Sequence, residues 1–410
     1  MIPKRVWLAV LVAFVCHGIF ILSARYRLSY DAYTHMLFAD HYAENWFSLW
    51  EPRWYTGFTV VSYPPLTHQL AALFVPLLGF DRAFALILWI VTSLYPLGVY
   101  SFSRIFTGKA AAAHAALASA LLLPIYVTAY VFGQFPFLTG TLLSLFSAAA
   151  LDGYLRKGGI HNLLLTLSLY AATMASHHAT LILQPFLVLA VTVNHALETP
   201  RTLQWRQFIS RFLLIGILAP LASLLVILPF WEWGMRQTMQ TPIDHLSRHN
   251  FLADPLAFAI FFFPLYGPIV AVIPFLIRKW HPRFIGLLSS FAILFLLGLG
   301  GTTPLPRWFF GANWEWLTYD RFAFWASLTL TPFFGMLFIR LKYGWKDRLA
   351  TPPKPASSQR KSLSALTFSI FAITALGAWF QSLVFPTQPT PHDKQPRGKI
   401  QEKEGRYQRG

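Results

Sequence analysis

Long runs of nearly uncharged residues recur along most of this chain, and they constrain its fold more than any other feature. About 20 such residues can cross the hydrocarbon core of a bilayer as a helix, which satisfies every backbone polar group internally. Charged residues make up only 12% of the chain, about half the share found in soluble domains. The sequence therefore predicts an all-α polytopic membrane protein.

The apolar runs predict about 11 spans, at residues 6–24, 83–104, 110–130, 135–153, 160–175, 179–197, 210–230, 255–277, 283–300, 321–341 and 363–383. The first run is long for a signal peptide and lacks a small-x-small cleavage site, so we interpret it as a span. The run Pro65–Phe80 is too short to cross, and we expect an interfacial or re-entrant helix there. Residues 1–385 then form one transmembrane domain, and the Pro-, Gln- and Lys-rich residues 386–410 form a disordered basic tail.

The net charge of +17 follows from short basic clusters between the apolar runs. These are Lys4/Arg5, Arg104/Lys109, Arg156/Lys157, Arg201/Arg206/Arg211, Arg278/Lys279/Arg283 and residues 340–361. Lys and Arg concentrate on the cytoplasmic side of membrane proteins. We therefore expect a cytoplasmic N-terminus, contact with the lipid bilayer and no nucleic-acid partner. Cys16 is the single cysteine, which excludes an intramolecular disulfide.

This topology places five loops on the non-cytoplasmic face. They are residues 25–82, the turn near Gly133, the turn at residues 176–178, residues 231–254 and residues 301–320. Acidic residues and tryptophans gather in these loops, and the large first loop holds Asp31, Asp40, Glu44 and Glu51. The sequence thus predicts that the functional residues lie on the non-cytoplasmic face and that the basic clusters lie on the cytoplasmic face.

The first loop contains a candidate acid–base pair. If residues 30–50 form a helix along the membrane surface, Asp31 and His35 lie four residues apart and can touch. A carboxylate beside an imidazole can act as a general base, or the two can share a metal ion. The alternative is an ordinary amphipathic surface helix, and we assign Asp40 and Glu44 to that role.

The loop ends with Tyr63-Pro64-Pro65-Leu66, in which the prolines stiffen the chain as it returns to the membrane. A first span followed by an early Asp, a His four residues later and YPPL resembles the C-type (multi-spanning) glycosyltransferase superfamily. The likeness is closest to the bacterial membrane domain labelled 6-pyruvoyl-tetrahydropterin synthase-related, and it covers the first hundred residues best. The chemistry of the soluble pterin enzyme is not implied.

The resemblance implies an enzyme of a bacterial inner (plasma) membrane that transfers a sugar from a polyprenyl-phosphate-type lipid donor on the non-cytoplasmic face. It implies that Asp31 is the catalytic base or a metal ligand. The commoner family pattern pairs two nearly adjacent acids, whereas no second acid lies within two residues of Asp31. This leaves open whether Mg²⁺ or Mn²⁺ takes part.

Transfer from a lipid phosphate also needs positive charge for the departing phosphate. Arg321 at the mouth of its span is our candidate, because Arg binds phosphate bidentately, and Asp320 could hold it in place. The alternative is a snorkelling interfacial Arg. Arg307 and Arg248 are weaker candidates for the phosphate.

Four further residues are predicted to contact substrate: His177 and His178 at a tight turn, Gln134 after Gly133, and Tyr63. Ionisable groups at such membrane depth are commonly functional. His245 and His249 would share a helix face near Asp244 and could bind a metal, although the pattern favours a solvated loop.

Two other classes of function fit the sequence. A transporter or flippase for a lipid-linked or small solute would place ionisable groups near the bilayer midplane, where this chain has few. A non-catalytic membrane subunit would explain the missing second acid beside Asp31.

Overall fold

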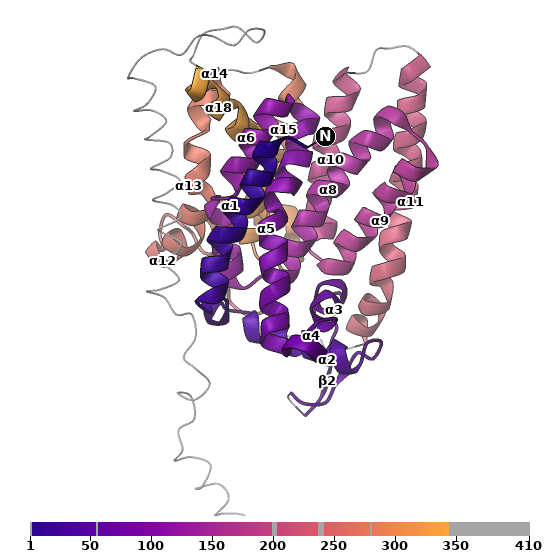
Figure 1. The fold of residues 1–410 in the computed structure, drawn as a ribbon, viewed down its shortest axis with the longest axis vertical. Helices are drawn as coiled ribbons and strands as arrows, with labels where there is room; N and C mark the ends of the chain where they lie inside the picture. The colour runs from indigo at the N-terminus through magenta and orange to yellow at the C-terminus, as the bar shows by residue number, and fades with distance from the viewer. Residues whose placement is uncertain (1, 55, 199–202, 237–241, 279–280, 344–410) are drawn as a thin grey trace, which may run out of the picture.

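The computed structural model describes residues 2–54, 56–198, 203–236, 242–278 and 281–343. Long helices lie side by side in a bundle, and the elements of the first loop gather at the end opposite the N-terminus (Figure 1). Within these residues, seven helical segments are long and apolar enough to cross a membrane, or eight if one bent pair counts as a span. The chain is therefore a multi-pass integral membrane protein.

Five candidate spans are single helices: α1 (Lys4–Leu22), α5 (Phe80–Phe106), α8 (Phe135–Lys157), α10 (Thr180–Glu198) and α11 (Leu203–Met235). A sixth is formed by α6 (Lys109–Ser119), α7 (Leu123–Val127) and the π-helix η2 (Thr128–Phe132) in succession. The seventh is formed by α12 (Pro255–Ala257), the π-helix η4 (Phe258–Phe262), α13 (Phe263–Val270) and α14 (Ile273–Arg278). The bent pair is α17 (Asp320–Thr329) with α18 (Thr331–Tyr343), and the bend between them is 43°.

The prediction of 11 spans is wrong, because two of the predicted apolar runs form helices too short to cross a bilayer. Helix α9 (Ile160–Ser176) has 17 residues, and the run of η5 (Pro282–Phe284) with α15 (Ile285–Gly298) also has 17. At 1.5 Å per residue each is about 25 Å long, shorter than the roughly 30 Å hydrocarbon core. The predicted span 363–383 and the predicted tail 386–410 lie outside the described residues.

Small residues allow close packing between helices that are distant in sequence. Helix α6 is rich in alanine and packs against α18, where a Cβ on Gly335 would stand 2.0 Å from the Ala111 carbonyl oxygen. Small residues at helix contacts are typical of membrane proteins, where close backbone approach replaces the hydrophobic driving force. By contrast, α11 exposes Leu213, Ile217 and Leu225 at the edge of the bundle, as expected of a lipid-facing surface.

The first loop folds into short elements. They are η1 (Arg25–Leu28), α2 (Ala32–Glu44), strands β1 (Trp50–Glu51) and β2 (Phe58–Thr59), which pair antiparallel, and helices α3 (Leu66–Ala72) and α4 (Val75–Leu78). The predicted helix over 30–50 is too long, because the chain turns at Asn45 to form the hairpin. Helices α3 and α4 replace the predicted short helix at 65–80, and neither is long enough to cross a bilayer.

A buried carboxylate fixes that hairpin to α2. Glu51 accepts hydrogen bonds from Arg53 and lies 3.0 Å from His41 Nδ1, and both the Glu51 and His41 side chains are fully buried. The same Arg53 pairs with Asp40 at 2.5 Å and Glu44 at 3.6 Å. The acids Asp40 and Glu44 thus have a structural role.

We expect Glu51→Gln to lower the melting temperature at pH 7. Hydrogen bonds from Arg53 lower the pKa of Glu51 to about 2, so its contribution is present above its ordinary pKa of about 4.3 and is lost as the pH falls toward 2. Thermal unfolding of both proteins between pH 7 and pH 3 should show the difference shrinking with acidity. Glu44→Gln, which alters an exposed pair, is the matched control, and an equal loss in it would contradict the prediction.

The remaining short elements lie in the later loops: η3 (Leu246–Arg248), η6 (Gly300–Thr302), α16 (Leu305–Phe310) and η7 (Gly311–Trp316). Contacts join all five predicted non-cytoplasmic loops. Tyr30 N donates to Val131 O, the Tyr63 ring lies 5.6 Å from His177, Trp231 Nε1 donates to His178, and Tyr319 N donates to Ser247 Oγ. The loops thus meet at one end of the bundle; which side of the membrane this end faces stays a prediction.

Candidate functional site

The backbone of Asp31 is held against the end of η2. Asp31 N donates to Phe132 O at 3.3 Å, and the preceding residue makes the equivalent bond to Val131 O. Gly133 follows with φ of +73°, and a Cβ there would stand 2.7 Å from Ser29 Oγ and 2.8 Å from Asp31 N. A π-helical turn is often found at a functional site. Here the π-helix η2 brings the backbone of the second loop against the backbone of Asp31.

We expect Gly133→Ala to destabilise the protein by about 1–3 kcal/mol, because positive φ strains any residue with a Cβ and the new atom would collide with the Asp31 backbone. Gly153→Ala is the matched control, since nothing lies within 4 Å of a Cβ at that position in α8. Melting temperatures of the two variants check this. Equal melting temperatures of the two variants would contradict the prediction and show that a Cβ at position 133 fits beside the Asp31 backbone.

The Asp31 carboxylate lies among charged groups from a distant segment. Burial raises its pKa to about 6, while nearby Arg321 opposes the shift and nearby Asp320 adds to it. A carboxylate with such a pKa is ionised near neutral pH and basic enough to accept a proton, as a general base requires. No second acid lies within two residues of Asp31 along the chain, but the fold brings Asp320 at the start of α17 near it.

Asp320 is bound by Gln134 and not, as predicted, by Arg321. Gln134 Nε2 donates to Asp320 Oδ2 at 2.7 Å, and both side chains are more than nine-tenths buried. Gln134 precedes α8 and Asp320 begins α17, so one hydrogen bond ties the second loop to the last loop. The two predicted residues are therefore neighbours, although they lie 186 positions apart.

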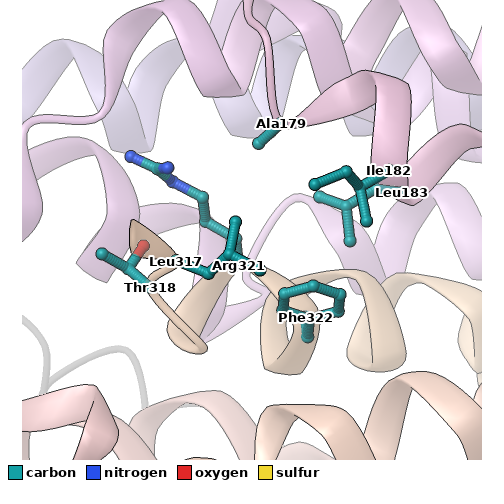
Figure 2. Close-up of a pocket in the computed structure, with 7 residues that line it drawn as sticks. All are labelled: Ala179, Ile182, Leu183, Leu317, Thr318, Arg321 and Phe322. Carbon is teal, nitrogen blue, oxygen red and sulfur yellow. The ribbon is translucent and has the colours of Figure 1, made fainter. Parts of the chain in front are cut away.

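Arg321 lines a pocket between α17 and α10 (Figure 2). Its walls are Ala179, Ile182, Leu183, Leu317, Thr318 and Phe322. Within the described part of the chain Arg321 forms no ion pair, its Nε has no hydrogen-bond partner, and its guanidinium lies 5.8 Å from the Phe137 ring. A guanidinium left without an anion beside a pocket can receive one from a ligand.

This pocket is small in the structure. Its cavity volume is about 10 Å³, which is about what one water molecule needs. A lipid phosphate with a sugar needs far more room than this.

His35 does not pair with Asp31 as predicted. His35 N bonds to the Asp31 carbonyl, but the ring's Nδ1 lies 3.1 Å from His68 Nε2, and its Nε2 has no partner. Tyr63 packs edge-on against the same ring at 4.9 Å. The sequence reasoning missed His68, although its position in the short apolar helix after Tyr63-Pro64-Pro65-Leu66 could have drawn attention to it.

The adjacent histidines at the turn between α9 and α10 have different environments. His177 is buried, accepts a hydrogen bond from Ala179 N, and lies 5.7 Å from the Phe137 ring beneath Arg321. His178 accepts from Trp231 Nε1 at 3.1 Å, which joins this turn to the C-terminal part of α11. Burial lowers the pKa of both, that of His178 to about 4. Both rings are thus neutral at pH 7, whereas Arg321 carries a permanent charge.

The predicted metal pair of His245 and His249 does not form. Helix η3 between them has only three residues, and His249 contacts Asp254 at 2.7 Å and Asp244 at 3.2 Å, whereas His245 bonds to Ser247. In the described ranges, no group of three or more His, Cys, Asp or Glu side chains could hold a metal ion. A metal bound by Asp31 stays a prediction.

Most of the predicted site residues thus come together. Asp31, Asp320, Arg321 and Gln134 form one polar cluster, and His35, Tyr63 and His177 border it, whereas His178 joins its turn to α11. His245 lies near Asp320 and Arg321 and joins the border. No protein-family model matches the chain, and no curated protein matches it significantly.

Proposed function

We propose that this protein is a membrane glycosyltransferase that uses a polyprenyl-phosphate-linked sugar. The observation that carries the proposal is the juxtaposition of Asp31 with Arg321 in one half-buried site at the loop-bearing end of the bundle. A carboxylate of raised pKa and an unpaired guanidinium are the two groups that transfer from a lipid phosphate to a hydroxyl requires. The resemblance of the first loop to C-type glycosyltransferases supports the same function.

The proposed reaction balances with these two groups. The Asp31 carboxylate accepts the proton of the acceptor hydroxyl as its oxygen forms a bond to the anomeric carbon of the sugar. The bond from that carbon to the phosphate oxygen breaks on the opposite side, which inverts the anomeric configuration. The leaving polyprenyl phosphate gains a negative charge, and Arg321 stabilises that charge.

A transporter or flippase for a lipid-linked solute is the alternative, and the small pocket is the observation that favours it. A closed site without room for a donor is expected of one state in an alternating-access cycle. The polar cluster lies at one end of the bundle and not midway along its helices, which supports the enzyme. A transporter would bind the same lipids without releasing polyprenyl phosphate.

Thermal unfolding of the purified protein in detergent with a panel of polyprenyl-phosphate hexoses tests the proposal. We expect at least one member to raise the melting temperature, because a ligand that binds only the folded state stabilises it. The uncharged polyprenol is the control for lipid binding without phosphate. If polyprenol stabilises as well as every phosphate-linked sugar, the site does not recognise a donor.

A further inference from the structure

Two buried oxygen atoms of the site have no hydrogen-bond partner among the residues that the structure describes. They are Gln134 Oε1 and Asp320 Oδ1, at the two ends of the pair already joined by the bond from Gln134 Nε2 to Asp320 Oδ2. Asp320 is only 2% exposed and Gln134 8%. Leaving a buried polar group unpaired costs about 1–3 kcal/mol, so two such atoms in one place suggest a missing partner.

The chemistry of these atoms restricts that partner. An amide oxygen and a carboxylate oxygen both accept hydrogen bonds, so a partner that serves both atoms must donate them. A phosphate diester brings acceptors and cannot fill this role. A hydroxyl group or an ammonium group can, and the adjacent Arg321 charge disfavours a second cation.

We propose that the Gln134–Asp320 pair is a hydroxyl-recognition subsite that binds the sugar of the lipid donor, while Arg321 binds its phosphate. This inference rests on the proposed function and assigns the sugar and the phosphate to adjacent residues of α17. Consecutive residues of a helix do not face each other, but Asp320 and Arg321 both lie near the Asp31 carboxylate, so their side chains can contact neighbouring groups of one ligand. Gln134 orients the Asp320 carboxylate and leaves one oxygen of each side chain for the sugar.

The test separates the sugar from the phosphate by thermal unfolding with polyprenyl phosphate, with a polyprenyl-phosphate hexose, and with the free hexose. The shift with the sugar-linked lipid minus the shift with polyprenyl phosphate is the sugar increment. We expect Gln134→Ala and Asp320→Asn to lose most of this increment. Asp320→Asn should also keep or increase the shift with polyprenyl phosphate, because it removes a negative charge beside Arg321.

Gln184→Ala is the matched control. Gln184 on α10 is equally buried, donates one bond to Ser147 Oγ at 2.6 Å and also has an unpartnered oxygen. It should keep the sugar increment even if it lowers the melting temperature. A shift by free hexose that depends on Gln134 would support the hydroxyl subsite but assign it to the acceptor.

Two results would overturn the proposal in distinguishable ways. If the sugar increment persists in both Gln134→Ala and Asp320→Asn, the unpaired oxygens bind water, although a lipid-donor site exists. If neither polyprenyl phosphate nor its sugar derivative shifts the melting temperature, and free hexose also has no effect, the donor site and the subsite both fail.

Discussion

Replacing Asp31 by Asn should lower the rate of sugar transfer by about 10²–10⁴-fold, the range that a positioned general base contributes. The Asn side chain keeps the size of Asp but cannot accept the proton of the acceptor hydroxyl. Initial rates of release of polyprenyl phosphate measure the effect. Turnover at the wild-type rate would exclude Asp31 as the base.

The same variant should keep its stability, which separates lost catalysis from lost folding. Burial raises the Asp31 pKa to about 6, above its ordinary value of about 3.9, so ionisation of this carboxylate opposes folding. Stability from the protonated form is complete below about pH 4 and is lost as the pH rises through 6. Asp31→Asn should therefore unfold at the same or a higher temperature than wild type at pH 8, and the wild-type rate should fall as the pH drops below 6.

Replacing Arg321 by Ala should weaken binding of polyprenyl phosphate by on the order of 100-fold, since losing one partner of a desolvated charge pair costs at least about 2–5 kcal/mol. Arg321→Lys should recover part of the affinity, because Lys keeps the charge but not the two parallel hydrogen bonds. Titration of the purified protein with polyprenyl phosphate, followed by thermal unfolding or intrinsic fluorescence, measures both variants.

Arg307→Ala is the control for that experiment. Arg307 is exposed on α16, and its replacement by Ala removes one positive charge, as Arg321→Ala does. It should bind polyprenyl phosphate as wild type does. Equal losses in Arg307→Ala and Arg321→Ala would mean that general electrostatic attraction binds the lipid, and that the Arg321 pocket is not its site.

Much of this site can be predicted from the sequence, because a predicted topology assigns each loop to one side of the membrane before any contact is known. Basic clusters predict which loops share a face, and that alone brings Asp31, Gln134, His177 and Arg321 together as candidates. The structure joins these loops at one end of the bundle. Whether the site binds a sugar donor stays a prediction.

The individual partners could not be predicted, because they depend on where helices end and turn. The contact of Asp31 with η2 needs a π-turn before Gly133, which no residue pattern indicates. The bond from Gln134 to Asp320 joins segments far apart in sequence, whereas local spacing favoured pairing Asp320 with Arg321 and Asp31 with His35. The number of spans failed for a different reason, since the apolar runs at α9 and at η5 with α15 form helices of only 17 residues.

Transfer of labelled sugar tests the central claim most directly. The protein in lipid nanodiscs would be incubated with radiolabelled polyprenyl-phosphate hexoses and with membrane extract from the producing cells as the source of acceptor. We predict that wild type moves label from one donor to an acceptor and releases polyprenyl phosphate, and that Asp31→Asn does not. Label that stays on the lipid with wild type, although the donor binds at Arg321, would contradict the enzyme and favour a transporter.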